Sequence, residues 1–319
     1  MATITRRILV KRAATVGKAV LMVVVVAFVA WTAWDLAERW RSSPPVTPHL
    51  GWTLAAVLPI VGVSLAQALG WLSLMHGMVG RRLPTVPALE LFLASMLGRY
   101  APAKVGMPVI LMSRAKQLEL APSLMGSSML LIVLVYTLLG TGIGVATLSL
   151  ADQAMLPQLE ALRSGLSVLA LAGMAVGVVV LLVLDRRRYP QALMRKLGVE
   201  GEGPLVGLGL VAWYTVVWLC WWAHGALLVH AVGGSWADAG AGAGLFVLAP
   251  VLGFLALVAP GGLGVREAVV AGGLSASVGP GPAVVAALLS RIISLAVDVV
   301  MWLGFRAVRR RRSAESETD

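Results

Sequence analysis

The sequence predicts an all-α membrane protein whose helices cross the bilayer several times. Of its 319 residues, 59% are hydrophobic and only 13% are charged, whereas a soluble domain carries about 25% charged residues. Several apolar stretches exceed the roughly 18 residues that a helix needs to cross the hydrocarbon core. These stretches are continuously apolar, and the lack of alternation excludes the strands of an outer-membrane barrel.

Six stretches are long and apolar enough to be full spans. They cover residues 19–37, 52–79, 122–150, 164–184, 205–231 and 283–305. The first runs past Trp34 without a small-residue cleavage site, so we interpret it as a retained span and not as a signal peptide. The predicted organisation is one transmembrane domain, residues 19–305, between a basic N-terminal segment, 1–18, and a charged tail, 306–319.

The basic residues indicate how the spans are oriented. Most of the 26 Lys and Arg residues lie before the first span, between the second and third, after the fourth and after the last. Because cytoplasmic loops hold the excess of Lys and Arg, both termini are predicted to be cytoplasmic. The net charge of +11 is then a topology signal, and we do not expect nucleic acid as a partner.

The segment between the second and third spans is too short for two further crossings. Basic residues stand on both of its sides, so it must enter and return on the cytoplasmic side. Each apolar arm, 87–98 or 105–113, reaches only about half of a core of about 30 Å at 1.5 Å per residue. A proline and a glycine interrupt the helix in "GRYAPAKVG". We predict a re-entrant hairpin with Arg99 and Lys104 near its tip.

Residues 239–279 are predicted to form a second hairpin, which enters from the outer face. Pro250 interrupts its first arm, and "APGGLG" breaks the chain before a short second arm, 265–278. The first arm is long enough to cross, so two broken crossings are an alternative. Span, hairpin and span thus occur twice in opposite orientation, which is the inverted-repeat plan of many transporters.

Four basic residues lie within or beside apolar stretches and are the strongest candidates for function. They are Arg99, Lys104, Arg266 and Arg291. A charge at membrane depth costs at least about 2.5 kcal/mol and usually faces a cavity or a partner. Broken helices also expose N–H groups that attract anions, and Gly261, Gly262 and Gly264 let the backbone approach a ligand closely. We expect these residues to bind an anionic group.

Two acidic residues accompany these cations. Glu267 is expected to pair with Arg99, Arg266 or Arg291, or to take up a proton, and a purely structural salt bridge between the hairpins is the alternative. Asp298 is a candidate proton relay, with a structural hydrogen bond to another helix as the alternative. Glu90 is expected at the membrane interface.

The remaining polar and aromatic residues do not indicate catalysis. The aromatic stretch "WLCWWAHG" is interpreted as an interfacial belt, with contact to lipid tails as the alternative. The histidines lack metal-ligand spacing, and we find neither a catalytic triad nor a pair of acids at hydrolase spacing. The sequence therefore predicts no enzyme, no cofactor and no metal site.

Three stretches, "RYAPAKVG", "PGGLGVREA" and "LLSRIISLAVD", resemble the membrane region of lysylphosphatidylglycerol synthases and their free-standing flippase-like relatives. The resemblance covers residues 50–305. The matched positions are Arg99, Pro102, Lys104, Gly106, Pro260, Gly261, Gly262, Gly264, Arg266, Glu267 and Arg291. In the two-part synthases, the membrane region is associated with moving a lipid that a separate cytoplasmic domain has modified. The given sequence contains no such domain, so the resemblance implies lipid translocation and not aminoacyl transfer.

The predicted function is a flippase-like translocase of a bacterial cytoplasmic membrane. It would move an anionic, phosphate-bearing lipid between leaflets through a midplane cavity lined by basic residues. Its partners would be that lipid and, further, a second copy of the chain or a lipid-modifying enzyme. The alternatives are a secondary transporter of small solutes or ions, or a membrane partner of an enzyme that modifies lipids or lipid-linked sugars.

Overall fold

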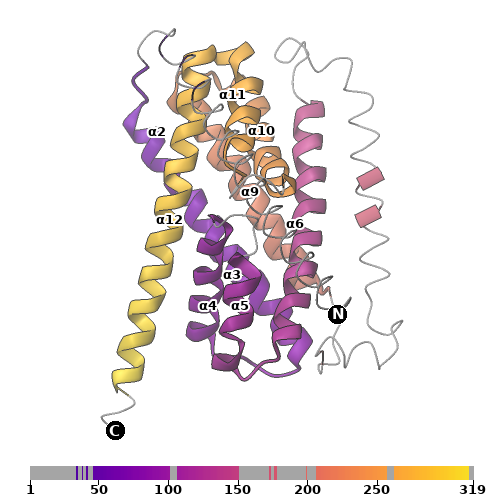
Figure 1. The fold of residues 1–319 in the computed structure, drawn as a ribbon. Helices are drawn as coiled ribbons and strands as arrows, with labels where there is room; N and C mark the ends of the chain where they lie inside the picture. Colours follow the sequence, from indigo (N-terminus) through magenta and orange to yellow (C-terminus); the bar gives the residue numbers. More distant parts are fainter. Residues whose placement is uncertain are drawn as a thin grey trace, which may run out of the picture.

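The computed structural model describes residues 46–100, 106–150, 206–256 and 262–315, together with isolated residues in 34–41 and 172–199. The elements in these ranges are helices joined by short turns, and none of them is a strand. Figure 1 shows the longer helices side by side as an elongated bundle. The predicted all-α, polytopic class is confirmed.

Five helical stretches are long and apolar enough to cross a membrane. They are α2 and α3 (Leu50–Ala55 and Val57–Val79, one continuous stretch), α6 (Pro122–Leu150), α9 (Leu208–Ala231), α10 (Trp236–Leu255) and α12 (Pro280–Glu315). Four of these coincide with predicted spans. The predicted spans 19–37 and 164–184 lie outside the described residues, apart from single positions.

Glycines let α3 and α9 pack closely in antiparallel directions. A Cβ on Gly62 would lie 2.9 Å from the Cys220 sulfur, and a Cβ on Gly70 would lie 2.8 Å from the Tyr214 ring. At one end the His49 N–H donates to the Ala231 carbonyl at 2.8 Å. Helices approach this closely in membranes because small residues remove the side chains that would separate them.

Two short helices connect α3 to α6 and form the first helical pair. These are α4 (Thr85–Leu97), which continues into the 3-10 turn η1 (Gly98–Tyr100), and α5 (Gly106–Ser113). A Cβ on Gly98 would lie 2.5 Å from the Gly106 carbonyl carbon, so the two arms converge there. A second 3-10 turn, η3 (Ala115–Leu118), leads into α6.

The second helical pair consists of α10 and α11 (Val265–Val278). The two helices are antiparallel, because Leu274 lies against Gly242 and Arg266 lies against Gly253. The predicted interruption at Pro250 is wrong, since α10 continues through this proline. Membrane helices tolerate proline where neighbouring helices cover the freed backbone group. In Figure 1, α11 lies in the half of the bundle opposite to α4 and α5.

The end of α10 lies beside the middle of α6. Leu248 packs on Gly144, and the rings of Phe254 and Tyr136 are 6.3 Å apart. Twenty residues are enough to cross a bilayer, yet these contacts leave the end of α10 about halfway along its neighbour. The first pair ends beside α12 in a comparable way, since Arg99 reaches Asp298.

The buried apolar side chains form two clusters. One is built mainly from α9 to α12 and contains Trp218 and Phe246. The other is built mainly from α3 to α6 and contains Trp71 and Phe92. Tyr136 packs against both, so the two halves of the bundle meet at the middle of α6.

Candidate functional site

A cavity lies where the two helical pairs meet. It encloses about 740 Å³, counting space that opens to its surroundings. Gln67, Tyr136 and Trp221 line it from positions near the middle of α3, α6 and α9. The cavity is therefore at mid-length of the long helices, as far as possible from both ends of the bundle.

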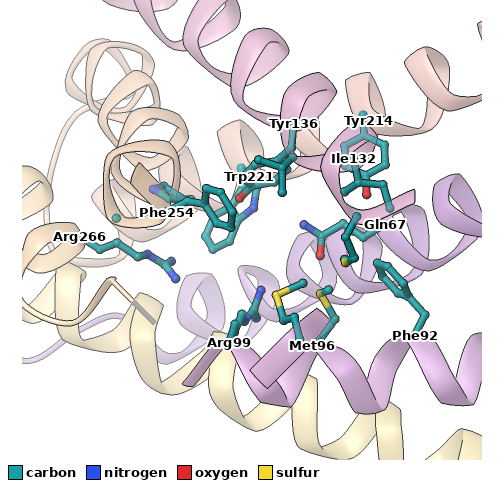
Figure 2. Close-up of a pocket in the computed structure, with 15 residues that line it drawn as sticks. Gln67, Phe92, Met96, Arg99, Ile132, Tyr136, Tyr214, Trp221, Phe254 and Arg266 are labelled. Carbon is teal, nitrogen blue, oxygen red and sulfur yellow. The ribbon is translucent and has the colours of Figure 1, made fainter. Parts of the chain in front are cut away.

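The wall of this cavity is apolar on one side and cationic on the other. Figure 2 shows Arg99 and Arg266 extending toward the same space, with Met96 beside Arg99 and with Phe92 and Ile132 on the far side of the cavity. The other apolar side chains of the wall are Met107, Met129, Val133, Pro250 and Phe254. Such a surface is complementary to an amphiphile that has an anionic group.

Arg99 reaches the cavity from η1 and is bound to α12. Its guanidinium donates to Asp298, and the Tyr100 hydroxyl donates to the same carboxylate oxygen at 2.7 Å. Asp298 is buried, with 4% of its side chain exposed, while Arg99 retains 22%. A buried carboxylate needs such partners because its desolvation is costly. The tip of the first pair is thereby attached to the last helix.

Arg291 connects this tip to the second helical pair. Its guanidinium lies over the Tyr100 ring, 5.2 Å from the centroid, and its Nε is 3.8 Å from Glu267 Oε1. The other Glu267 oxygen accepts the Gly264 N–H at 2.7 Å. Glu267 therefore caps the start of α11 and pairs with Arg291, which is one of the three partners that the sequence suggests.

Two glycines of the "PGGLGVREA" motif adopt conformations that other residues rarely take. Gly262 has φ +70° and Gly264 has φ +81°, both in the left-handed region that favours glycine. Gly262 also packs directly on the backbone of Gly253, since a Cβ there would lie 2.8 Å from the Gly253 Cα. These glycines place the start of α11, with Arg266, against α10.

Arg266 differs from the other two arginines of the site. Its guanidinium lies over the Trp221 ring at 4.9 Å, and it lines both the main cavity and a smaller one of about 230 Å³. Among the described residues, no carboxylate lies within 4.0 Å of it. Arg99 and Arg291 each face a carboxylate, so the described part of the site carries one positive charge in excess.

The structure brings together most of the residues that the sequence predicts for the site. These are Arg99, Gly262, Gly264, Arg266, Glu267, Arg291 and Asp298. Lys104 and Gly261, and with them Pro102 and Pro260, lie outside the described residues. That these groups bind a ligand, and that Glu267 or Asp298 relays a proton, stay predictions.

Sequence reasoning missed three residues of the site. Tyr100 follows Arg99 directly, and Gln67 is a single amide in an apolar span, which is itself a signal of a polar environment. Trp221 belongs to the stretch interpreted as an interfacial belt. That interpretation is wrong for Trp218 and Trp221, which are at most 2% exposed and lie in the middle of α9, because the rings fill the space between packed helices.

Glu90 lies near the middle of α4, nine residues before Arg99. It is 3% exposed, and its oxygens accept from Trp302 Nε1 at 3.2 Å and from Arg309 Nη1 at 2.8 Å. Arg114 Nη1 is 3.5 Å away. Three donors thus surround one carboxylate and attach the first helical pair to α12 a second time.

Comparison with known proteins relates the chain to one protein family. The family model described as "Lysylphosphatidylglycerol synthase TM region" matches residues 18–301. No curated protein matches the chain. Within the described residues, no group of three or more His, Cys, Asp or Glu side chains is placed to hold a metal ion.

Proposed function

Because the chain belongs to the family of the lysylphosphatidylglycerol synthase transmembrane region, we propose that it is a flippase-like lipid translocase. It moves an anionic, phosphate-bearing lipid between the leaflets of a bacterial cytoplasmic membrane. The headgroup enters the cavity between the two helical pairs, and the hydrocarbon chains stay in lipid or along the apolar wall. The chain itself makes no covalent change to the lipid.

The proposed topology contains two re-entrant hairpins of opposite orientation in one domain, residues 19–305. The α4–α5 pair enters from the cytoplasmic face, where the charges of the flanking segments place it. The α10–α11 pair enters from the outer face, and both termini are cytoplasmic. Helices that stop inside the bilayer are tolerated where protein or a polar cavity covers their ends, and such ends form the binding sites of many transporters.

The observation that carries this proposal is the position of Arg266. A guanidinium without a carboxylate partner among the described residues faces a cavity at mid-length of the bundle. Burying an uncompensated charge is costly, and a bound anion would offset that cost. A phosphate group suits the site because guanidinium binds two of its oxygens together.

The apolar wall favours a lipid over a small hydrophilic solute. A sugar or an ion would need polar groups on all its sides, whereas Phe92, Met96 and Ile132 leave part of the cavity wall apolar. A transporter of small solutes is therefore the second candidate. Assistance to a lipid-modifying enzyme is compatible with the same cavity and would require a partner.

Lipid exchange between leaflets of reconstituted vesicles tests the proposal. The purified chain is inserted in vesicles of phosphatidylglycerol and phosphatidylethanolamine with a trace of fluorescent phosphatidylglycerol, and dithionite reports the outer-leaflet fraction. We expect Arg266→Gln to slow exchange at least about tenfold, because a charge-assisted contact is worth roughly 1.5–3 kcal/mol. Arg310→Gln removes an equal charge from an exposed position of α12 and should exchange lipid like the wild type. Equal rates in all three proteins would refute the mechanism.

A further inference from the structure

The cavity contains hydrogen-bond donors that the rest of the protein leaves unused. In the described part of the chain, three buried side-chain atoms lack any hydrogen-bond partner: His76 Nε2, Arg99 Nε and Trp221 Nε1. Two of the three belong to residues that line this one cavity. A buried donor without a partner destabilises a fold by roughly 1–3 kcal/mol, so such atoms are rare and each one calls for an explanation.

Trp221 is an exception among the buried tryptophans of the described residues. Trp71 Nε1 donates to the Ser128 hydroxyl at 3.2 Å, and Trp218 Nε1 donates to the Tyr136 carbonyl at 3.1 Å. All three rings are at most 2% exposed, and indole N–H groups usually find a partner when buried. Only the Trp221 ring lines the cavity, so burial alone does not explain its unused donor.

The orientation of Trp221 is set from two sides. Arg266 lies over its ring at 4.9 Å, and the His224 ring meets it edge-on with centroids 5.6 Å apart. His224 is itself held through both ring nitrogens, by the Ala56 carbonyl and the Ser290 hydroxyl. The indole therefore cannot turn easily to find another acceptor, and its N–H stays available to whatever occupies the cavity.

Gln67 adds a second neutral group on the opposite side of the cavity. It is 6% exposed, and no hydrogen bond joins its side-chain amide to another described residue. In Figure 2 the Gln67 amide points into the space that Trp221, Arg99 and Arg266 share. The amide can donate to an anion, while its neighbours Phe92 and Met96 cannot.

We propose that Trp221 and Gln67 are headgroup-binding residues, which donate neutral hydrogen bonds to the oxygens of a phosphate that Arg266 and Arg99 attract by charge. This inference deepens the proposed function and depends on it for the class of ligand. Indole and guanidinium groups only donate, so the site suits a ligand rich in acceptors. A phosphate oxygen cluster meets this condition, whether it belongs to a lipid headgroup or to free phosphate.

Titration calorimetry on the solubilised full-length chain separates these ligands. The probes are dihexanoylphosphatidylglycerol, inorganic phosphate and the uncharged dihexanoylglycerol. We expect Trp221→Phe and Gln67→Met each to weaken binding of the phosphodiester lipid at least about tenfold, because a hydrogen bond to a charged group is lost. The Phe variant keeps an aromatic ring under Arg266, and the Met variant keeps the side-chain length.

Thermal unfolding distinguishes a binding role from a structural one. Removing an unused buried donor should leave the Tm of both variants unchanged or raise it. Trp71→Phe is the matched control, since it removes a donor that Ser128 uses. This control should lower the Tm and leave lipid binding unchanged. Lower Tm values for Trp221→Phe and Gln67→Met with wild-type affinity would overturn the inference.

The outcomes also separate this inference from the proposed function. Absence of lipid exchange, with binding that still depends on Trp221 and Gln67, would refute translocation and support the binding site. Equally tight binding of inorganic phosphate would support the donors and indicate a free anion as the ligand. A wild-type chain that binds neither the lipid nor phosphate would overturn the inference.

Discussion

The two helical pairs that meet at the cavity are held by different contacts. The α4–α5 pair is attached to α12 through charges, at Asp298 beside the cavity and at Glu90 near the middle of α4. The α10–α11 pair is held by close packing, in which Gly253 and Gly262 bring two backbones into direct contact. The α10–α11 pair also has an ionic contact with α12, between Glu267 and Arg291, and the arms of the α4–α5 pair also meet at two glycines, Gly98 and Gly106. The difference is that the ion pair of Arg99 lies at the cavity wall, whereas Glu267 and Arg291 do not line this cavity.

The two helical pairs are expected to respond differently when a ligand enters the cavity. An incoming anion competes with Asp298 for Arg99, because both bind the same guanidinium. The ion pair of the α10–α11 pair, Glu267 with Arg291, does not line this cavity, and no ligand can compete with the backbone contact between Gly253 and Gly262. We expect the α4–α5 pair to be the side that adjusts to the headgroup, and the α10–α11 pair to be a rigid wall that presents Arg266.

The largest loss of stability is expected when a side chain is added at Gly253, where α10 and α11 are in direct contact. In Gly253→Val the new Cβ would start only 2.5 Å from Arg266 Cγ, and overpacking of this kind costs about 1–3 kcal/mol or more. We expect a loss near the top of this range in the free energy of unfolding, measured by titration with SDS. Gly240→Ala is the control in the same helix, because nothing lies within 4 Å of a Cβ there. Equal stability of the two variants would show that the close contact is not present.

The next largest effect is expected from breaking the ionic contact beside the cavity. Asp298→Ala leaves Arg99 without its carboxylate, which costs about 3–5 kcal/mol for a fully buried pair. Arg99 is partly exposed, so we expect about 2 kcal/mol. The double variant Arg99→Leu/Asp298→Leu should recover most of this loss, since it removes both charges. Strictly additive losses in the double variant would contradict a direct pair.

A smaller effect is expected at the remote contact of the same pair. Glu90→Gln removes the negative charge but keeps an oxygen that can accept from Trp302. Arg309 and Arg114 are each about a third exposed, so solvent screens their attraction to the carboxylate. We expect a loss of about 1 kcal/mol at low salt that shrinks at high salt. A loss that does not depend on salt would assign the contact to hydrogen bonding alone.

The smallest effect on stability is expected for Arg266→Gln. The charges of Arg291 and Arg99 repel Arg266, whereas Glu267 and Tyr136 favour its charge. Arg266→Gln should therefore leave the free energy of unfolding unchanged or raise it slightly, because removing a buried charge without a carboxylate partner relieves the cost of its burial. A large destabilisation would assign Arg266 a structural role and weaken its assignment to the headgroup.

Much of this arrangement could be predicted from the sequence because the lipid bilayer restricts which backbone structures and which charged residues can lie in it. Three long helices were predicted to within three residues of their ends, since a continuous apolar stretch has few other structures in a bilayer. The fourth, α12, runs ten residues beyond its predicted end at 305. The short arms around "GRYAPAKVG" and "PGGLGVREA" were found by length and charge alone. Arg99, Arg266, Glu267 and Arg291 stood out because charges are rare in apolar stretches.

The pairing of these residues could not be predicted, because it depends on which helices become neighbours. Asp298 and Arg99 are 199 positions apart, and the sequence around each residue does not indicate which residue is its partner. The interfacial position expected for Trp221 is wrong because the sequence pattern of an aromatic residue does not distinguish an interfacial belt from a packed core. The helix break expected at Pro250 is absent because a membrane helix accommodates proline where neighbouring helices cover the freed backbone group.

Labelling of introduced cysteines tests the opposed entry of the two pairs most directly. The chain has one cysteine, Cys220, so Cys220→Ala provides a background for single sites. Arg82→Cys and Lys116→Cys flank the first pair, and Ala237→Cys and Ala276→Cys lie at the open end of the second; all four positions are exposed. With a membrane-impermeant maleimide, we predict that the first two react only after the cells are permeabilised and the last two react in intact cells. Reaction of the two members of either pair from opposite sides of the membrane would contradict the account.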